Sequence, residues 1–376
     1  MTSKPVSVLI LSNSLNIGGA QRFAGTLLRG LDRSRVRPRL AVLQEDIGYP
    51  LPADVPVHSL AHDGAKDLPR SVLRLRRLIL RVRPAVVLGT GTAVNVIIGL
   101  TYLSLRNPPV WIARVDTSPD RTDLRIRMHI LRWLYPMANM LIANSIGLQR
   151  SLKMHYPGIR RKIGRIYNPV DFDFLERQSR QSQPGRSAGE VQTLVTVGRA
   201  YRVKRWDLLL EAVARVPQAM PIRLVCCGDG PLLDKSRTQA RSLSIESRVQ
   251  FPGHCPNPFS ILAQAELFVL SSDAEGLPNA LIEAQGLGLC AVATRCPFGP
   301  EEIITHGETG LLVDMGNADQ MARAIRVLLE NPSLRCQMGA KARKQTRERF
   351  DFYSRCREWE QLILDCAAST VQHRNE

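Results

Sequence analysis

Two glutamates, Glu275 and Glu283, stand in the segment with the clearest potential for chemistry. The segment follows an apolar run at 267–270, and Pro278 suits the start of a helix that would contain Glu283. The free N–H groups of a helix start can hold an anion, and carboxylates accept hydrogen bonds from sugar hydroxyls. A largely helical spacing would separate the two carboxylates by roughly 10–12 Å, which is too far for the acid pair of a glycoside hydrolase. The pattern therefore favours binding of a sugar and an anion over hydrolysis of a glycosidic bond.

A second group of candidate residues is cationic. Arg199 comes directly after the apolar run VQTLVTV, and Lys204 follows it with Arg202 and Arg205 close by. Arginine binds phosphate oxygens through two parallel hydrogen bonds, and lysine supplies a compact charge. Cations at a helix start are not favoured by the helix dipole. A phosphate clamp is therefore favoured slightly over the alternative, a solvated basic loop.

Two glycines follow the first apolar run of the chain. Gly18 and Gly19 lie between VSVLILSN and a helix-like segment, where missing Cβ atoms would let backbone N–H groups approach an anion. An ordinary turn is the alternative interpretation. Neither G-x-x-x-x-G-K-[ST] nor, in the loops after the first strand of each half, G-x-G-x-x-G occurs. A P-loop NTPase or a nicotinamide dehydrogenase therefore loses its main support.

Alternating strand-like and helix-like segments must position these residues. Besides the two runs that open the halves, strand-like runs are predicted at 40–43, 86–88, 110–113, 140–143, 223–227, 249–251, 267–270 and 291–294. Such alternation predicts an α/β fold with parallel, doubly wound sheets covered by helices on both faces. Ligands of such sheets bind outside the carboxyl ends of the strands.

The domain organisation follows from one polar stretch. Residues 176–190 contain Pro, Gly and almost no apolar side chain, which indicates a linker. The sequence thus predicts an N-terminal domain at 1–175 and a C-terminal domain at 191–349. A final helix, within 350–376, is expected to pack back on the N-terminal domain. The natural ligand site of such a protein is the cleft between its domains.

Targeting and redox signals point to the cytoplasm. The 22 residues 84–105 carry no charge and could span a bilayer, but their Gly-Thr-Gly-Thr break favours a buried strand, loop and helix. The chain leads straight into a strand-like run without the pattern of a signal peptide. Its eight cysteines show no C-x-x-C spacing, so neither a zinc site nor a disulfide scaffold is indicated.

The charge is concentrated in one half. The chain has 51 Lys and Arg against 34 Asp and Glu, and residues 1–180 hold 28 of these bases but only 12 of the acids. Such a field attracts phosphate-rich partners, namely nucleic acid, an anionic membrane surface or a diphosphate. Aromatic residues are only 5% of the chain, which counts against stacking on nucleic acid. The Arg-rich segments 67–84 and 121–136, the latter with Trp133, are expected to lie on anionic lipid. The alternative is two surface helices of a soluble enzyme, facing their own core.

Five motifs in this order resemble one known family. They are the Gly18-Gly19 loop, IYNPVD at 166–171, VGR with Arg199 and Lys204, GDGP at 228–231, and the E-x7-E pattern of Glu275 and Glu283 in EGLPNALIEA. Together they resemble the retaining glycosyltransferases of family 4, which have the GT-B fold of two Rossmann-like domains facing across a cleft. The match covers nearly the whole chain.

The resemblance implies that a nucleotide-activated sugar, most often a UDP-sugar, binds mainly to the C-terminal domain. Arg199 and Lys204 would then neutralise the diphosphate leaving group, so no metal or other cofactor is expected. Glu283 would accept hydrogen bonds from the ribose hydroxyls, and Glu275 would hold hydroxyls of the donor sugar. The remaining residues implied in donor binding contribute backbone groups: Gly276, Leu277, Asn279, Gly18 and Gly19.

Asp116 is the candidate catalytic residue outside that domain. It occupies a place where members of the family carry a polar residue, often His and sometimes Asp, near the acceptor and the anomeric carbon. The alternative is a helix cap formed with its neighbours Thr117 and Ser118. The sequence departs from the family at Arg205, where many members have Gly. The string Asp171-Phe172-Asp173 mimics a metal motif of the other glycosyltransferase fold and is expected to be structural.

The sequence thus predicts a hexosyl- or N-acetylhexosaminyl-type glycosyltransferase on the cytoplasmic face of the membrane. Its CPFGPEEI and EGLPNALIEA segments look similar to bacterial enzymes of capsule, O-antigen or lipid-linked oligosaccharide assembly. The expected partners are a nucleotide-sugar donor and a glycan or lipid-linked acceptor. Two alternatives stay open, a basic nucleic-acid-binding protein and a catalytically silent partner that binds sugar nucleotides.

Overall fold

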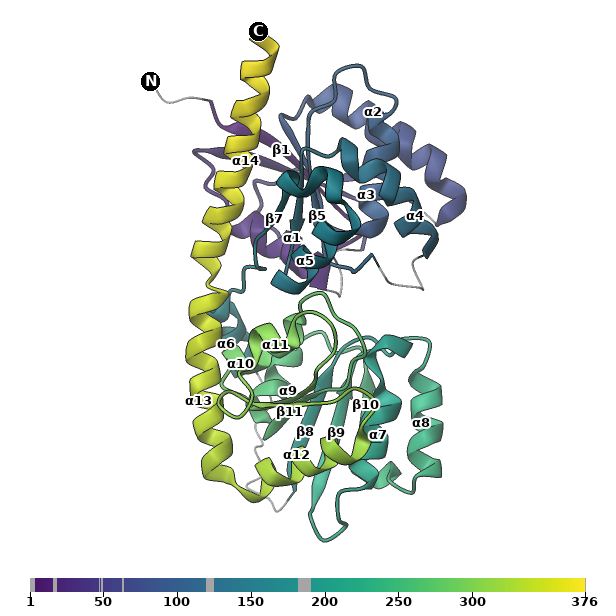
Figure 1. Cartoon of the computed structure of the whole chain (residues 1–376), viewed down its shortest axis with the longest axis vertical. Helices are drawn as coiled ribbons and strands as arrows, with labels where there is room; N and C mark the ends of the chain where they lie inside the picture. The colour runs from purple at the N-terminus through teal and green to yellow at the C-terminus, as the bar shows by residue number, and fades with distance from the viewer. Residues whose placement is uncertain are drawn as a thin grey trace. The chain divides into compact units, whose positions relative to one another are not determined.

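The chain divides into two compact units. The computed structural model describes residues 4–15, 19–46, 48, 50–62, 64–119, 125–181 and 191–375. The N-terminal unit consists of residues 1–169 together with 352–376, and the C-terminal unit consists of residues 170–351. Each unit contains one parallel sheet with helices packed on it (Figure 1), which confirms the α/β class predicted from the sequence.

The sheet of the N-terminal unit is parallel throughout its described strands, in the order β3-β2-β1-β4-β5-β6-β7. Its strands are β1 (Val6–Ser12), β2 (Val36–Val42), β3 (Val57–Ser59), β4 (Val86–Gly89), β5 (Val110–Val115), β6 (Met140–Ala143) and β7 (Ile163–Arg165). The helices of this unit are α1 (Gly19–Gly30), α2 (Leu68–Val82), α3 (Thr92–Tyr102), α4 (Arg125–Leu134), α5 (Ile146–His155) and α14 (Phe352–Asn375).

The C-terminal unit repeats this strand order, as β10-β9-β8-β11-β12-β13. Its strands are β8 (Gln192–Val197), β9 (Ile222–Cys227), β10 (Val249–Gly253), β11 (Leu267–Leu270), β12 (Ala291–Thr294) and β13 (Leu311–Val313). Its helices are α6 (Phe172–Arg180), α7 (Trp206–Ala214), α8 (Leu233–Ser242), α9 (Pro258–Gln264), α10 (Asn279–Gly286), α11 (Pro300–Ile303), α12 (Ala318–Glu330) and α13 (Pro332–Arg349). In both sheets the order of strands reverses beside the first strand, which creates a switch point at the strands' carboxyl ends.

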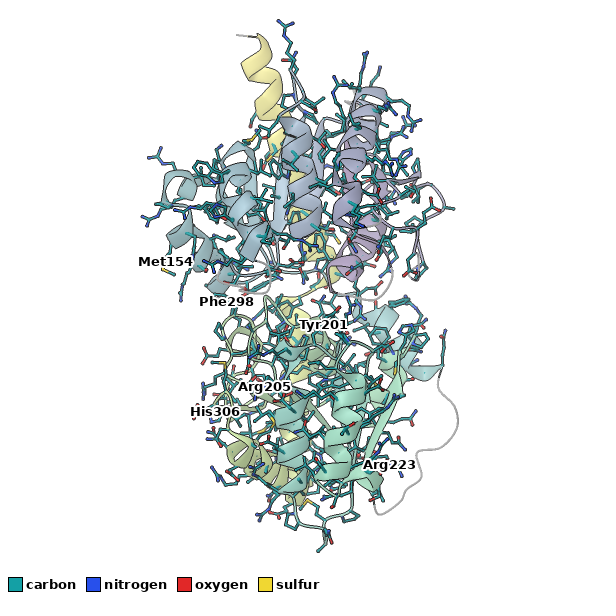
Figure 2. All side chains as sticks on the ribbon, turned by 90° about the vertical axis from the view of Figure 1, so that its right-hand side faces the viewer. Met154, Tyr201, Arg205, Arg223, Phe298 and His306 are labelled. Atoms are coloured by element: carbon teal, nitrogen blue, oxygen red, sulfur yellow. The ribbon has the colours of Figure 1, made fainter. Side chains whose placement is uncertain are left out.

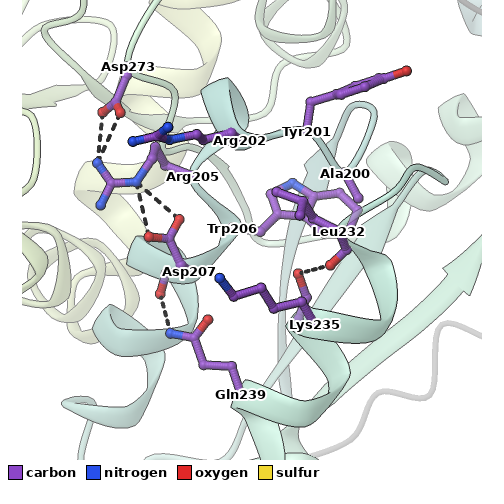
Figure 3. Close-up of a pocket in the computed structure, with 11 residues that line it drawn as sticks. Ala200, Tyr201, Arg202, Arg205, Trp206, Asp207, Leu232, Lys235, Gln239 and Asp273 are labelled. Atoms are coloured by element: carbon purple, nitrogen blue, oxygen red, sulfur yellow. Dashed lines mark hydrogen bonds and ion pairs between the residues drawn. The ribbon is translucent and has the colours of Figure 1, made fainter.

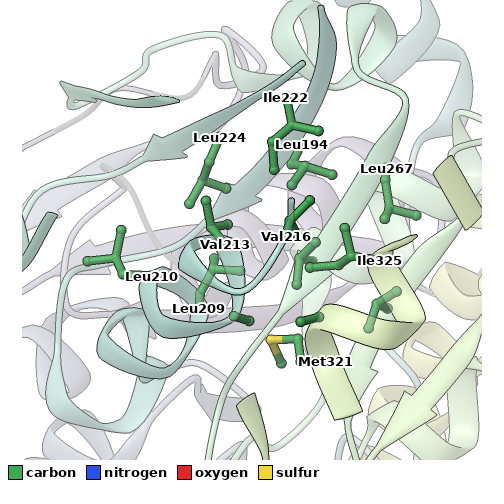
Figure 4. Packing of buried hydrophobic residues seen from close by; sticks show 14 of the residues in the cluster. Leu194, Leu209, Leu210, Val213, Val216, Ile222, Leu224, Leu267, Met321 and Ile325 are labelled. Carbon is green, nitrogen blue, oxygen red and sulfur yellow. The ribbon is translucent and has the colours of Figure 1, made fainter. Parts of the chain in front are cut away.

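The core of the C-terminal unit explains why these segments fold as they do. Leu194 of β8 and Leu224 of β9 face Leu209 and Val213 of α7, while Met321 lies on the adjoining helix α12 (Figure 4). These side chains are fully removed from solvent. The apolar residues of α7 recur at helical spacing, so that this helix buries one face. Strands β11 and β12 are buried at every position, as strands of a parallel sheet covered on both faces are.

Helix α14 completes the core of the N-terminal unit. Trp359 and Ile363 are fully buried in the cluster that also contains β1 and α1, and the rings of Trp359 and Phe23 meet edge to face at 5.1 Å. The carboxylate of Glu360 accepts from Asp32 N at 3.0 Å and from Arg35 Nη1 at 2.6 Å. The last helix is therefore an integral part of the N-terminal unit, although it is the last element of the chain.

The boundary between the units lies before the predicted linker. Residues 172–180 form α6, whose first residues Phe172 and Leu175 are buried in the C-terminal unit, and Asp171 caps this helix by accepting from Phe174 N at 2.8 Å. Glu176 forms ion pairs with Arg343 and Arg347 of α13. The polar composition of 176–181 thus reflects a paired helix surface, and residues 182–190 lie outside the described residues.

The uncharged segment 84–105 forms β4, a short loop and α3, as the sequence predicts. Of the 11 residues of α3, Val94–Gly99, Thr101 and Tyr102 are buried. Among the described residues no helix combines the length and the apolar character that crossing a membrane would need.

Candidate functional site

The predicted donor residues of the C-terminal unit lie on both sides of its switch point. Arg199 and Lys204 follow β8, and Glu275 follows β11. Strands β8 and β11 are hydrogen-bonded neighbours in the sheet, with Leu194 opposite Leu267. The two loops therefore leave the sheet side by side, where α/β proteins bind their ligands.

Lys204 and Glu275 form an ion pair at this point. Lys204 Nζ donates to Glu275 Oε1 at 2.6 Å, and Ser272 Oγ donates to the same oxygen at 2.6 Å. The two charged side chains are 25% and 10% exposed. The backbone is held as well, because Ser271 Oγ donates to Lys204 O at 2.8 Å. The residues predicted to hold diphosphate and sugar are thus brought into direct contact.

Arg199 lies in the same loop with a different partner. Its Nη2 donates to the hydroxyl of Tyr201 at 2.7 Å, and its Cζ lies 4.6 Å from the centre of the Tyr201 ring. Both side chains are exposed. A guanidinium held on an exposed ring keeps further N–H groups for an anion.

Glu283 lies inside the helix predicted to contain it. It is only 1% exposed on α10, the helix that begins at Asn279 directly after Pro278. Leu277, two residues after Glu275, is also buried, at 7% exposure. The structure thus places Glu283 one turn inside α10 and Glu275 in the loop before it.

The loop after β12 supports this segment, a contact that the sequence analysis missed. Glu275 N donates to Pro297 O at 3.4 Å. Phe298 and Gly299 both have positive φ, at 65° and 93°, and a Cβ atom added to Gly299 would lie 2.4 Å from Pro278 Cδ. Non-glycine residues in this conformation concentrate at functional sites. The string CPFGPEE, with its adjacent Phe and Gly, is the signal that could have found it. Phe298 is labelled in Figure 2.

Arg205 departs from the family pattern in its side chain but keeps a backbone conformation that suits glycine. Its φ and ψ are 49° and 46°, the left-handed conformation that glycine adopts most easily. The guanidinium bridges two carboxylates, with Nε 3.0 Å from Asp207 Oδ1 and Nη1 3.0 Å from Asp273 Oδ2. The hydrogen bonds to Asp207 and then those to Asp273 raise the pKa of Arg205 against the opposing effect of partial burial. The family's usual glycine is therefore replaced by an arginine whose side chain ties the loops after β8 and β11.

Asp116 of the N-terminal unit pairs with a buried arginine. Arg114 on β5 is 1% exposed, and its Nη1 lies 3.0 Å from Asp116 Oδ2. Its Nη2 donates to Asn168 Oδ1 at 3.0 Å, and its Cζ lies 4.2 Å from the Phe23 ring. Burial lowers the pKa of Arg114, and Asp116 counteracts that shift.

Asp116 caps no helix within the described residues that directly follow it. Thr117 Oγ1 donates to Asp116 Oδ1 at 3.2 Å, and residues 117–119 are not helical. The carboxyl side chain is 20% exposed. Asp116 is thus held by its neighbours at the carboxyl end of β5 and remains accessible to a ligand.

The glycines of the first loop are only partly described. Gly18 lies outside the described residues, and Gly19 is the first residue of α1. In the string Asp171-Phe172-Asp173, Asp171 has the structural role expected of it, because it caps α6. Within the described ranges, no three His, Cys, Asp or Glu side chains come together as metal ligands would.

Two family models match the chain in succession. Residues 17–174 match Glycosyltransferase Family 4, and residues 177–345 match Glycosyl transferases group 1. The chain is also similar to N-acetylgalactosamine-N,N'-diacetylbacillosaminyl-diphospho-undecaprenol 4-alpha-N-acetylgalactosaminyltransferase of Campylobacter jejuni. The two are 26% identical over 335 residues, which cover 86% of this chain and 90% of the relative.

Two solved structures share the fold. Anabaena HepE, crystallised in complex with UDP-glucose, superimposes with a TM-score of 0.78 at 19% identity, over 96% of this chain and 99% of its own. Sucrose-phosphate synthase from Thermosynechococcus elongatus gives a TM-score of 0.82 at 16% identity, over 97% of this chain and 100% of its own. These likenesses confirm the GT-B fold expected from the sequence.

Proposed function

Because the chain belongs to the glycosyltransferases of family 4 and group 1, we propose that it moves a hexosyl or N-acetylhexosaminyl unit from a UDP-sugar to a lipid-linked glycan acceptor. The observation that carries the proposal is the contact of Lys204 with Glu275 at the switch point of the C-terminal sheet. This contact joins a cation suited to a diphosphate and a carboxylate suited to sugar hydroxyls.

In the proposed reaction the bond between the anomeric carbon and the diphosphate oxygen breaks, and a bond to an acceptor hydroxyl oxygen forms. The electron pair of the broken bond leaves with UDP, whose β-phosphate develops negative charge and takes up the proton that the acceptor hydroxyl loses. Arg199 and Lys204 stabilise that charge, so the reaction needs no metal. Glu283 holds the ribose, Glu275 the donor sugar, and Asp116 stands near the reacting hydroxyl. Retention of the anomeric configuration is part of the proposal through the family resemblance.

The similar proteins support the choice of donor and acceptor. HepE was crystallised with UDP-glucose, and the name of the Campylobacter relative describes a transferase acting on a diphospho-undecaprenol glycan. An acceptor of that kind is anchored in a membrane by its lipid. We therefore propose that the chain works as a peripheral protein on the cytoplasmic face of the membrane.

Helices α2 and α4 are the proposed membrane contact. Helix α2 buries Ser71, Leu75, Leu78 and Ile79, yet its Leu73 and Leu80 are 52% and 49% exposed among arginines. On α4, Ile126 and Trp133 are 78% and 74% exposed. Exposed apolar side chains set among cations suit an interface with anionic lipid.

A transfer assay tests the proposed function. The full chain is incubated with a panel of UDP- and GDP-sugars and a short-chain lipid diphosphate glycan, with a chelator present, and the product is analysed by mass spectrometry and NMR. We expect one UDP-sugar to be consumed and one glycosidic bond to form with retained configuration. Lys204→Ala and Glu275→Ala should abolish transfer, whereas the exposed control variants Lys344→Ala and Glu308→Ala should keep it.

The alternatives predict other outcomes. A catalytically silent partner binds a sugar nucleotide without any turnover under these conditions. A nucleic-acid-binding protein ignores every nucleotide sugar and binds DNA or RNA with an affinity that falls steeply with salt. Either result would replace the proposed function.

A further inference from the structure

A cavity of 590 Å³ lies on the C-terminal unit, apart from the Lys204–Glu275 pair. Its walls come from the loop after β8, the start of α7, the first turns of α8 and Asp273 (Figure 3). Neither Lys204, Glu275, Arg199 nor Glu283 lines it. The volume lies in the range of pockets that hold small organic ligands.

The two carboxylates of this cavity share one cationic partner. Asp207 and Asp273 both pair with Arg205, at 3.0 Å in each case. Gln239 Nε2 donates to the backbone oxygen of Asp207 at 3.2 Å, which fixes this wall further. Together with Arg205 the two acids therefore keep one net negative charge, which is smaller than the charge of the two further cations in the lining.

Two further cations line the same cavity. Arg202 and Lys235 are exposed, and neither makes an ion pair or a side-chain hydrogen bond within the part of the chain that the structure describes. Lys235 extends from α8 toward the wall that Asp207 forms (Figure 3). With three basic and two acidic side chains around it, the cavity has a net positive charge.

The base of the cavity is buried and apolar. Trp206 is 4% exposed and Ala200 2% exposed, and the Trp206 ring packs against Phe251 at 6.3 Å between centroids. Ser236 Oγ donates to Leu232 O at 3.0 Å, which fixes the first turn of α8. A concave surface with two unpaired cations and a net charge of one positive unit suits a ligand that joins an anionic group to an organic body.

We propose that this cavity is a second ligand site, which binds a small phosphate ester or diphosphate through Arg202 and Lys235. Arginine supplies paired donors to a phosphate and lysine a compact charge. The ligand would contact the outer side of the loop whose Lys204 faces Glu275. The binding step does not require the proposed transfer reaction, which is needed only to identify the Lys204–Glu275 pair as the donor site.

Pyrophosphate is the probe for this site. The full chain is saturated with UDP, so that the donor site is filled, and pyrophosphate is titrated by calorimetry. We expect one bound pyrophosphate, and about tenfold weaker binding in the double variant Arg202→Gln/Lys235→Gln. The control Arg223→Gln/Lys341→Gln removes the same charge from exposed residues outside the cavity and should bind as the parent does. Arg223 is labelled in Figure 2.

A second titration identifies the source of the phosphate. Farnesyl diphosphate binding more tightly than pyrophosphate, with the same sensitivity to Arg202→Gln/Lys235→Gln, would assign the site to a lipid-borne diphosphate. Equal affinities would assign it to a water-soluble phosphate compound. The proposal is overturned if pyrophosphate does not bind beside UDP, or if both double variants weaken its binding equally. If UDP itself does not bind, the donor assignment fails, and titration of pyrophosphate alone into the two double variants still decides on the cavity.

Discussion

Lys204 Nζ lies 2.6 Å from Glu275 Oε1, so the cation assigned to the diphosphate is held by the carboxylate assigned to the sugar. The pair joins the loops after the two central strands β8 and β11. A diphosphate that approaches Lys204 must compete with this carboxylate for the ammonium group. The two residues should therefore have opposite effects on binding of the bare nucleotide.

Glu275→Gln is expected to bind UDP about fivefold more tightly than the parent, because removal of one adjacent anion strengthens the field of Lys204 by roughly 1 kcal/mol. The same variant should lose transfer, since it no longer holds the donor sugar as a carboxylate does. Lys204→Gln should weaken UDP binding instead. Calorimetry with UDP and a transfer assay measure both quantities. Weaker UDP binding in Glu275→Gln than in the parent would contradict the assigned roles.

Arg205→Gly and Arg205→Ala separate the backbone of this residue from its side chain. Both variants lose the ion pairs with Asp207 and Asp273, which are partly exposed and contribute about 0.2–1 kcal/mol each. Of the two, only the alanine variant keeps the strain of a φ of 49°. This left-handed conformation costs a non-glycine residue roughly 1–2 kcal/mol.

We therefore expect Arg205→Gly to be close to the parent in its free energy of unfolding and Arg205→Ala to be lower by about 1 kcal/mol. Urea unfolding monitored by circular dichroism measures the difference. Equal stability of the two variants would show that the left-handed conformation is not retained in solution. Because both variants remove the same cation beside Lys204, UDP binding should be similar in the two variants.

Much of the architecture could be predicted from the pattern of apolar residues along the chain. The apolar runs at 267–270 and 291–294 became β11 and β12 as expected, because a run of buried residues bounded by turn signals has few other structures open to it. The three-residue strands β3, β7 and β13 were missed. A strand of three residues is stabilised mainly by its hydrogen bonds to a neighbouring strand. The local sequence does not show which strand that neighbour will be.

The site shows the same division. The segment that holds Glu275 and Glu283 could be recognised by its residues, but the support from Phe298 and Gly299 depends on a loop that the fold brings back to Pro278. The pair of Arg114 and Asp116 carried a signal that went unused. Residues two positions apart in a strand lie on the same face. A cation in an apolar strand, followed two positions later by an anion, therefore predicts an ion pair.

Asp116→Ala is expected to destabilise the N-terminal unit as well as to stop transfer. It leaves the guanidinium of Arg114, 1% exposed, without its carboxylate. Breaking a buried pair in this way costs about 3–5 kcal/mol, and the 20% exposure of Asp116 places the effect toward the lower value. Thermal unfolding of the variant and the parent measures this loss.

A double variant separates the two roles of Asp116. Arg114→Met/Asp116→Asn removes both charges together, so we expect most of the stability to return. If Asp116 acts on the acceptor, the double variant does not transfer sugar even though its stability is restored. Recovery of transfer together with stability would show that Asp116 is needed only as the partner of Arg114.

Ile126→Ser/Trp133→Ser tests the proposed membrane contact. These two side chains of α4 are the most exposed apolar groups among those described, and burying them in a lipid interface contributes about 25 cal/mol for each Å² removed from water. The vesicles contain about 30% phosphatidylglycerol, so that their surface is anionic. We expect the double variant to bind them at least about tenfold more weakly than the parent. Co-sedimentation measures the affinity.

The control Met315→Ser/Val327→Ser changes exposed apolar residues of the C-terminal unit and should bind as the parent does. Equal loss in the two double variants, or binding insensitive to salt, would place the contact elsewhere than on the basic helices.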